Sequence, residues 1–186
     1  MSESTARPTV TVGLSSCGIA AGAGRVMETF REEIKKRGLD VALRRTGCVG
    51  MCYNEPIVDV ELPGRPKATY GGVKHDAVAR IIEDHIVGGE PVEDLLVRAE
   101  DRELPDESYY APQVRVVLRN AGVIDPESID EYIEVGGYEA LEKVVTSMSP
   151  EDVIEVMKAS GLRGRGGAWA KSMLFGLGWA RSSCNR

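Results

Sequence analysis

Hydrophobic and polar positions follow a strand-like period in four short segments of the N-terminal half. Apolar, β-branched runs at 10–14 and 41–45 predict two strands. Runs at 57–62 and 67–70 predict two more, which form a hairpin about the proline- and glycine-bearing turn at 63–66.

Two other segments of this half carry apolar residues at helical spacing. Val26, Phe30 and Ile34 fall on one face of a predicted helix, and Gly38 ends it. A second helix is predicted over 76–87. The resulting order, β-α-β-β-β-α, predicts a small α/β layer in which two helices cover a sheet.

The pattern changes at 88–112. This stretch is acidic, carries prolines and has weak periodicity, which predicts an interdomain linker with one helical turn near Leu95. The segment 113–120 is again typical of a strand. These changes divide the chain into a first domain at 8–98, a linker at 99–112 and a second region that begins at 113.

Two helix starts in the second region have the same design. Asp125 and Ser149 each stand directly before a proline, and such side chains cap helices whose first residue is proline. Asp152 completes a capping box with Ser149, and the last helix is expected to stop at Gly161. A glycine-rich loop with two arginines then follows at 161–168.

Composition and charge narrow the class of protein. The 186 residues are 42% hydrophobic and 28% charged, which is typical of a globular chain. The net charge of −6 argues against nucleic acid as a partner. No stretch approaches the roughly 20 apolar residues of a membrane span, and the N-terminus has no signal-peptide pattern. We therefore expect a cytoplasmic protein, in which four cysteines indicate metal or redox chemistry rather than disulfides.

Three of the cysteines form a candidate metal site. Cys48 and Cys52 have the spacing C-x-x-x-C between glycines, and Cys17 follows the first predicted strand. Thiolates suit iron–sulfur clusters and zinc, and backbone N–H groups near glycines can aim at sulfur. The spacing alone also fits a pair of buried thiols in a turn. Zinc held by the three cysteines and His75 is a further alternative, although His75 is placed to cap the second helix.

The cysteine motifs carry a resemblance to a known family. The segments SSCGIAAGAGRV (15–26), TGCVGMCYNEPIVDV (46–60) and TYGGVKHDAVARIIEDHIVGGEPVEDLL (69–96) resemble the thioredoxin-like [2Fe–2S] ferredoxin domain of respiratory NADH dehydrogenase. The same domain is fused to flavin-binding subunits of NADH-dependent hydrogenases and formate dehydrogenases. The resemblance covers about 8–98.

The resemblance implies a fold and a ligand set. In the family four cysteines hold the cluster, and here Cys17, Cys48 and Cys52 match, whereas the strand end VTVGLSS lacks the fourth. Either Ser15 or Ser16 ligates in its place, or the domain has lost its cluster and serves as a docking module.

Residues 113–168 resemble the start of the NADH- and FMN-binding subunit of the same enzymes. In that family the glycine-rich loop contacts FMN, a role that the resemblance assigns to Gly164, Arg165, Gly166 and Gly167. The match fails after Ala168, where the chain reads AWAKSMLFGLGWARSSCNR. The expectation is a truncated or frame-shifted product with an aberrant tail at 169–186, an incomplete FMN-binding α/β domain, no bound FMN or NAD, and an incidental Cys184.

The predicted function follows from both resemblances. The chain is expected to be an electron-transfer module of an NADH-dependent oxidoreductase, in which electrons pass from NADH through FMN to iron–sulfur centres. The alternative is a non-catalytic docking domain that binds partner subunits. No catalytic residue is assigned. The expected partners are other subunits of such a complex, without nucleic acid and without membrane insertion, so that any membrane contact at the inner face runs through those subunits.

Overall fold

The computed structural model describes residues 7–99, 113–116 and 118–161. The chain forms two compact units, Met1–Val135 and Gly136–Arg186. The cysteine motifs and the sheet lie in the first unit, and the last two helices form the described part of the second.

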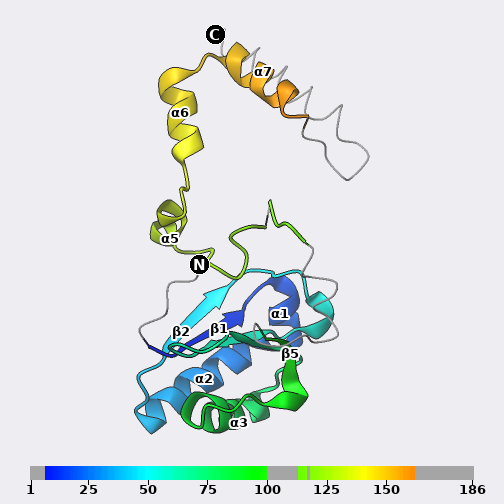
Figure 1. The fold of residues 1–186 in the computed structure, drawn as a ribbon, viewed down its shortest axis with the longest axis vertical. Helices are drawn as coiled ribbons and strands as arrows, with labels where there is room; N and C mark the ends of the chain where they lie inside the picture. The colour runs from blue at the N-terminus through cyan, green and yellow to red at the C-terminus, as the bar shows by residue number, and fades with distance from the viewer. Residues whose placement is uncertain (1–6, 100–112, 117, 162–186) are drawn as a thin grey trace. The chain divides into compact units, whose positions relative to one another are not determined.

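A five-stranded sheet is the centre of the first unit, with the strand order β2-β1-β3-β4-β5 (Figure 1). The strands are β1 (Thr9–Gly13), β2 (Ala42–Thr46), β3 (Val58–Glu61), β4 (Ala68–Tyr70) and β5 (Leu96–Ala99). β1 pairs in parallel with β2, whereas the other three pairs are antiparallel. The parallel pair requires a crossover, and helix α2 provides it.

The helical elements are mostly short. They are α1 (Ser16–Ala21), α2 (Ala23–Arg37), the turns η1 (Cys52–Asn54) and η2 (His75–Ala77), α3 (Val78–Arg80), its π-helical continuation η3 (Ile81–Val87), and η4 (Glu93–Leu95). Helix α2 ends at Gly38, whose φ of 63° is left-handed, so that its N–H bonds back to Ile34 and Lys35. In Figure 1, α2 and α3 lie on the same face of the sheet.

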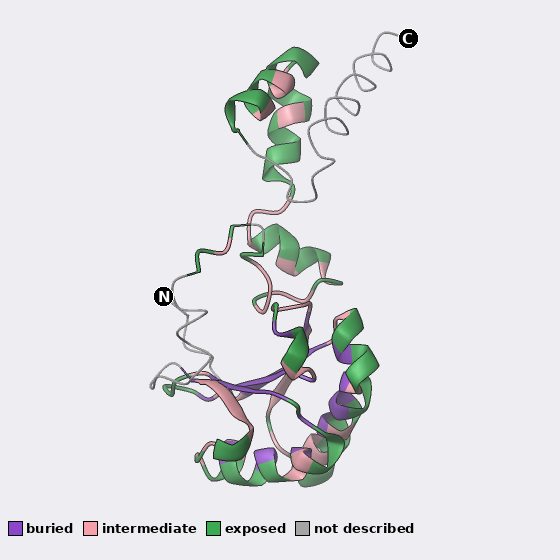
Figure 2. Cartoon of the chain, turned by 90° about the vertical axis from the view of Figure 1, so that its right-hand side faces the viewer, coloured by how far each residue is buried: buried purple, intermediate pink, exposed green. Residues whose placement is uncertain are grey.

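The hydrophobic core fills the space between this face and the two helices. Val10, Val58 and Val60 of the sheet are fully buried, as are Phe30 of α2 and Ile82 of η3. Figure 2 shows the buried residues along the strands and on the inward sides of the helices. The predicted α/β layer with the order β-α-β-β-β-α is confirmed, including the helix end at Gly38.

Three details differ from the prediction. The stretch 88–112 begins with more structure than a linker: η4 supplies the expected turn near Leu95, and β5 then adds a strand to the edge of β4. The strand expected at 113–120 is wrong for 113–116 and 118–120, which form no strand. Helix α5 (Ile129–Glu134) begins after Ser128 rather than after Asp125, whose carboxylate instead accepts a bond from the N–H of Glu127.

The second unit, taken by itself, contains α6 (Glu139–Ser147) and α7 (Pro150–Ala159). The capping box at α7 is confirmed: the Ser149 hydroxyl accepts from the Asp152 N–H, and the Asp152 carboxylate accepts from the Ser149 N–H. The helix ends at Ala159, close to the expected stop at Gly161.

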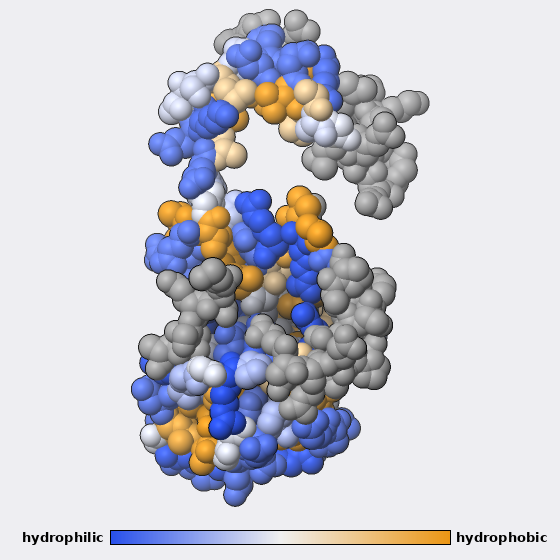
Figure 3. Space-filling model, viewed as in Figure 1, coloured by the Kyte–Doolittle hydropathy of each residue, from blue (hydrophilic) through white to orange (hydrophobic). Residues whose placement is uncertain are grey.

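Apolar side chains gather on the surface of the first unit between 114 and 133. Val114 is 88% exposed, and Leu118, Val123, Ile129 and Ile133 are also exposed. Figure 3 shows hydrophobic side chains near α5, in the middle of the view. Within the described ranges, no helix is both long and apolar enough to cross a membrane.

Candidate functional site

Three cysteines converge where the parallel strands β1 and β2 end. Cys17 is in the first turn of α1, directly after β1. Cys48 lies in the loop after β2, and Cys52 opens η1 at the end of that loop. The N–H of Leu14 donates to the carbonyl of Thr46 over 2.9 Å, which joins the two strand ends and brings the loops together.

The sulfur atoms are close enough to interact. The Sγ atoms of Cys48 and Cys52 are 3.8 Å apart, and Cys17 is near enough to affect the pKa of Cys52. Cys48, and after it Cys17, raise the pKa of the Cys52 thiol to about 11, because a thiolate at Cys52 is disfavoured next to other cysteine sulfurs and their negative charge. The N–H of Gly50, a residue with a left-handed φ of 91°, donates to the Cys48 sulfur over 3.3 Å. The loop therefore aims a backbone donor at a thiol, as the sequence predicts.

A carboxylate links the two cysteine-bearing segments. Glu55 accepts from the Ser15 hydroxyl over 3.2 Å and from the Ile57 N–H over 3.0 Å. The Ser15 oxygen also accepts from the N–H of Gly18 and thereby caps α1. Sequence reasoning did not identify Glu55, because nothing in a single acidic residue before a proline indicates that it reaches back to the first strand.

Gly18 allows α1 to approach β1 closely. A Cβ atom at this position would lie 2.5 Å from the carbonyl oxygen of Gly13 and 3.0 Å from a carboxylate oxygen of Glu55. The absence of a side chain at Gly18 therefore sets the position of α1, and with it that of Cys17.

The zinc alternative is not formed by the side chains as they stand. In residues 7–99, 113–116 and 118–161, no group of three or more His, Cys, Asp or Glu side chains is placed to hold a metal ion. His75 is exposed in η2. A two-iron cluster places a different demand on the site, since each iron takes its own ligands and the three thiols need not share one ion.

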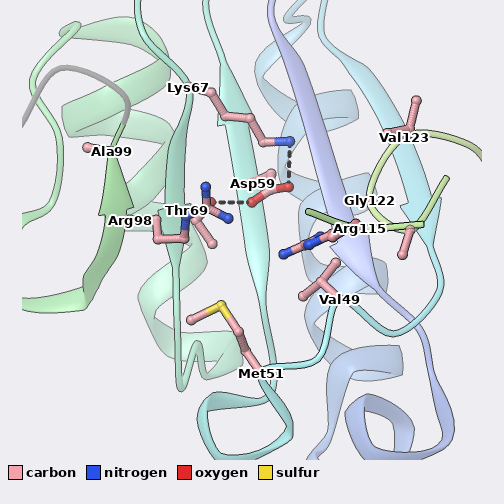
Figure 4. A pocket seen from close by; sticks show the side chains of 11 residues that line it. Val49, Met51, Asp59, Lys67, Thr69, Arg98, Ala99, Arg115, Gly122 and Val123 are labelled. Atoms are coloured by element: carbon pink, nitrogen blue, oxygen red, sulfur yellow. Dashed lines mark hydrogen bonds and ion pairs between the residues drawn. The ribbon is translucent and has the colours of Figure 1, made fainter. Parts of the chain in front are cut away.

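A polar cavity of about 190 Å³ lies beside the cysteine loop and was not predicted from the sequence (Figure 4). Asp59, a buried residue of β3, accepts from the Thr69 hydroxyl over 2.6 Å and pairs with Lys67 over 2.8 Å. Burial works to lower the pKa of Lys67, but the charges of Asp59 and Glu61 outweigh it and raise the pKa overall. The only signal in the sequence was an acidic residue at an alternating position of a strand.

The other predicted site residues lie outside the described part of the chain. Gly164, Arg165, Gly166 and Gly167 of the predicted FMN loop belong to this group, as does Cys184. Their roles stay predictions.

Comparisons with known proteins give two kinds of relative and similar solved structures; no family model matches. The NADP-reducing hydrogenase subunit HndB of Solidesulfovibrio fructosivorans is 35% identical over 88 residues, which are 47% of this chain and 70% of that subunit. A 2Fe–2S ferredoxin of Clostridium pasteurianum is 42% identical over 74 residues, 39% of this chain and 70% of that ferredoxin.

The second kind of relative is much longer than the matched segment. The HndC subunit of the same S. fructosivorans hydrogenase is 61% identical over 56 residues, 30% of this chain but only 11% of that subunit. Among solved structures, a thioredoxin-like [2Fe–2S] ferredoxin from Aquifex aeolicus matches with 28% identity and a TM-score of 0.46, over 50% of this chain and 93% of that one.

Proposed function

Because the chain belongs to the family of 2Fe–2S ferredoxins and HndB-type hydrogenase subunits, we propose that its first unit holds a [2Fe–2S] cluster and transfers electrons within a multi-subunit, NAD(P)H-linked oxidoreductase. The observation that carries this proposal is the convergence of Cys17, Cys48 and Cys52 at one end of the sheet. The alternative, a docking domain without a cluster, draws its support from the missing fourth cysteine.

The residues present fit such a cluster in three respects. Cys17, Cys48 and Cys52 supply soft sulfur donors, which iron–sulfur clusters require. Neighbouring sulfurs raise the pKa of Cys52 and so disfavour its thiolate in the metal-free chain, whereas the positive charge of bound iron would favour that thiolate. The Gly50 N–H already donates to a ligand sulfur, a contact that tunes reduction potential.

The fourth ligand is the open position of the set. The Ser15 hydroxyl accepts from the Gly18 N–H at the start of α1 and donates to Glu55, so both of its hydrogen-bonding roles are already filled within the fold. Ser16 is exposed beside Cys17, and we assign the fourth position to Ser16. When bound, the cluster would supply one-electron transfer; the residues around it hold it and set its exposure to solvent.

The flavin and nicotinamide chemistry is a separate proposal, which rests on the resemblance of 113–168 to the start of the NADH- and FMN-binding subunit. The chain spans 11% of the HndC subunit that it matches. We propose that 113–168 corresponds to the start of an FMN- and NADH-binding region, in which Gly164, Arg165, Gly166 and Gly167 hold the positions that contact FMN in the intact family, while this chain alone binds neither FMN nor NAD. The partners are then the other subunits of the complex, in the cytoplasm, with any membrane contact made through those subunits.

Anaerobic reconstitution with iron and sulfide tests the cluster directly. We expect about two irons and two sulfides per chain, with visible absorbance. Cys48→Ala and Cys52→Ala should abolish that absorbance, whereas Cys184→Ala, which changes a thiol outside the proposed set, should leave it intact. If the unaltered chain never takes up iron and sulfide, the cluster is refuted and the docking alternative stands.

A further inference from the structure

The surface of β2 next to the cysteine loop is basic, and an acidic segment from far along the chain covers it. Arg45 pairs with Asp125 over 2.8 Å and with Glu127 over 2.6 Å. Arg44 pairs with Glu131 of α5. The positive side chains of one strand thus meet three carboxylates that follow the predicted linker.

A buried hydroxyl fixes the same contact at a single point. Thr46 is only 4% exposed, and its hydroxyl accepts from the Gly122 N–H over 3.0 Å while it donates to the Ile124 carbonyl over 3.3 Å. A side-chain hydroxyl that serves one N–H and one carbonyl of the same segment sets that segment's register on β2.

The covered surface extends onto both neighbours of Cys48. A Cβ atom on Gly122 would lie 3.3 Å from a methyl carbon of Val49, and one on Gly47 would lie 3.9 Å from the ring of Pro126. Figure 4 shows Val49 and Gly122 on the same side of the cavity. The segment therefore lies against the residues before and after a proposed ligand.

Electrostatics favours the contact in its charged form. Partial burial works to raise the pKa of Asp125, but the hydrogen bond and charge of Arg45 outweigh it and lower the pKa overall. The bond to Asp125 in turn raises the pKa of Arg45. The pair is therefore charged at neutral pH.

We propose that the segment 122–131 is a latch, which docks on Arg44, Arg45 and Thr46 and restrains the Cys48 loop. The latch determines how freely the Cys48 thiol reaches solvent and reagents. The effect of the latch is measured on the Cys48 thiol, so the test needs no bound cluster. A negative result would therefore not count against the proposed cluster.

A charge swap in the full-length, metal-free, reduced chain tests the latch. The rate of alkylation by iodoacetamide is followed at each cysteine by tandem mass spectrometry. Arg45→Glu and Asp125→Arg should each speed the alkylation of Cys48 by about fivefold. This is the increase in the undocked population that is expected when a partly exposed group of ion pairs is lost. The double variant restores the pair between positions 45 and 125 but leaves Glu127 facing a carboxylate, so its rate should fall below those of both single variants without reaching that of the unaltered chain. Cys17 provides an internal control, whose rate should stay constant.

A second pair of variants covers the case in which charge reversal disturbs the fold. Thr46→Val removes both hydroxyl bonds at nearly constant volume, whereas Thr46→Ser keeps them. We expect faster alkylation of Cys48 in Thr46→Val only. The latch is refuted if the Cys48 rate is unchanged in the single variants, if the double variant stays as fast as the single variants, or if Cys17 accelerates in parallel, since that last result reports general loosening.

Discussion

Replacement of Gly18 by alanine should destabilise the first unit, although the same change usually stabilises a helix. In an open helical position, Gly→Ala gains about 0.5–1 kcal/mol because alanine loses less backbone entropy. At Gly18, however, the added methyl would stand 2.5 Å from the carbonyl oxygen of Gly13, a backbone atom that cannot rotate away.

The free-energy cost of this clash should exceed the gain in helix propensity. Overpacking of a tight contact costs about 1–3 kcal/mol, because α1 must move away from the end of β1. The net expectation is a loss of about 1–2 kcal/mol in the free energy of unfolding. A shift of α1 would also displace Cys17 and strain the Ser15–Glu55 hydrogen bond.

Gly24→Ala is the matched control. Gly24 lies in α2, and apart from the neighbouring backbone of its own helix no atom lies within 4 Å of an added Cβ, so this variant should be neutral or gain up to about 1 kcal/mol. Urea unfolding followed by circular dichroism gives both free energies, and equal slopes confirm that the denatured states are comparable. The reasoning is wrong if Gly18→Ala is as stable as the unaltered chain, or if Gly24→Ala loses as much as Gly18→Ala.

Two pH-dependent predictions follow from the described geometry. Burial and then Arg65 lower the pKa of His85, whose Nδ1 lies 2.7 Å from the Tyr70 hydroxyl, so the neutral ring is the folded form. The free energy of unfolding should therefore fall as the pH is lowered below about 6.5, by up to about 1.4 kcal/mol per pH unit. Urea titrations at pH 5–6.5 should show that His85→Asn lacks this pH dependence. If the free energy of unfolding has the same slope against pH in both proteins, His85 is not its cause. The pKa of about 11 at Cys52 predicts that its alkylation rate in the metal-free chain keeps rising up to that pH, where an ordinary thiol has levelled off. In Cys48→Ser the rate should level off at lower pH, and the same profile in both would contradict the assigned cause.

Periodicity was sufficient to predict the central fold. The helix face of Val26 and Phe30 is buried as expected, and the strands that precede the cysteine motifs lie within a residue or two of their predicted bounds. Strand β5 was missed because its four residues follow an acidic, proline-bearing stretch, and its pairing with β4 is a tertiary preference that local composition does not reveal. The helix start expected at Asp125 failed because this carboxylate forms a turn with Glu127 and pairs with Arg45.

The candidate site could be predicted from the sequence only in part. Cys17, Cys48 and Cys52 could be identified by residue type and motif, and the structure brings them together. Glu55 and Thr46 could not, because each acts through a contact with a residue distant in sequence, and a lone carboxylate or hydroxyl carries no periodic signal. Their roles depend on the register of β1 against β2.

The parallel pairing of β1 with β2 has a consequence for how the protein is made. Cys17 leaves the ribosome well before Cys48 and Cys52, and the thiols meet only after α2 has crossed over and β2 has paired with β1. Such non-local pairing is slow compared with helix formation. The nascent chain therefore presents separate, reactive thiols before it presents a site, and we expect cofactor delivery during biosynthesis to follow folding of the crossover rather than to nucleate it.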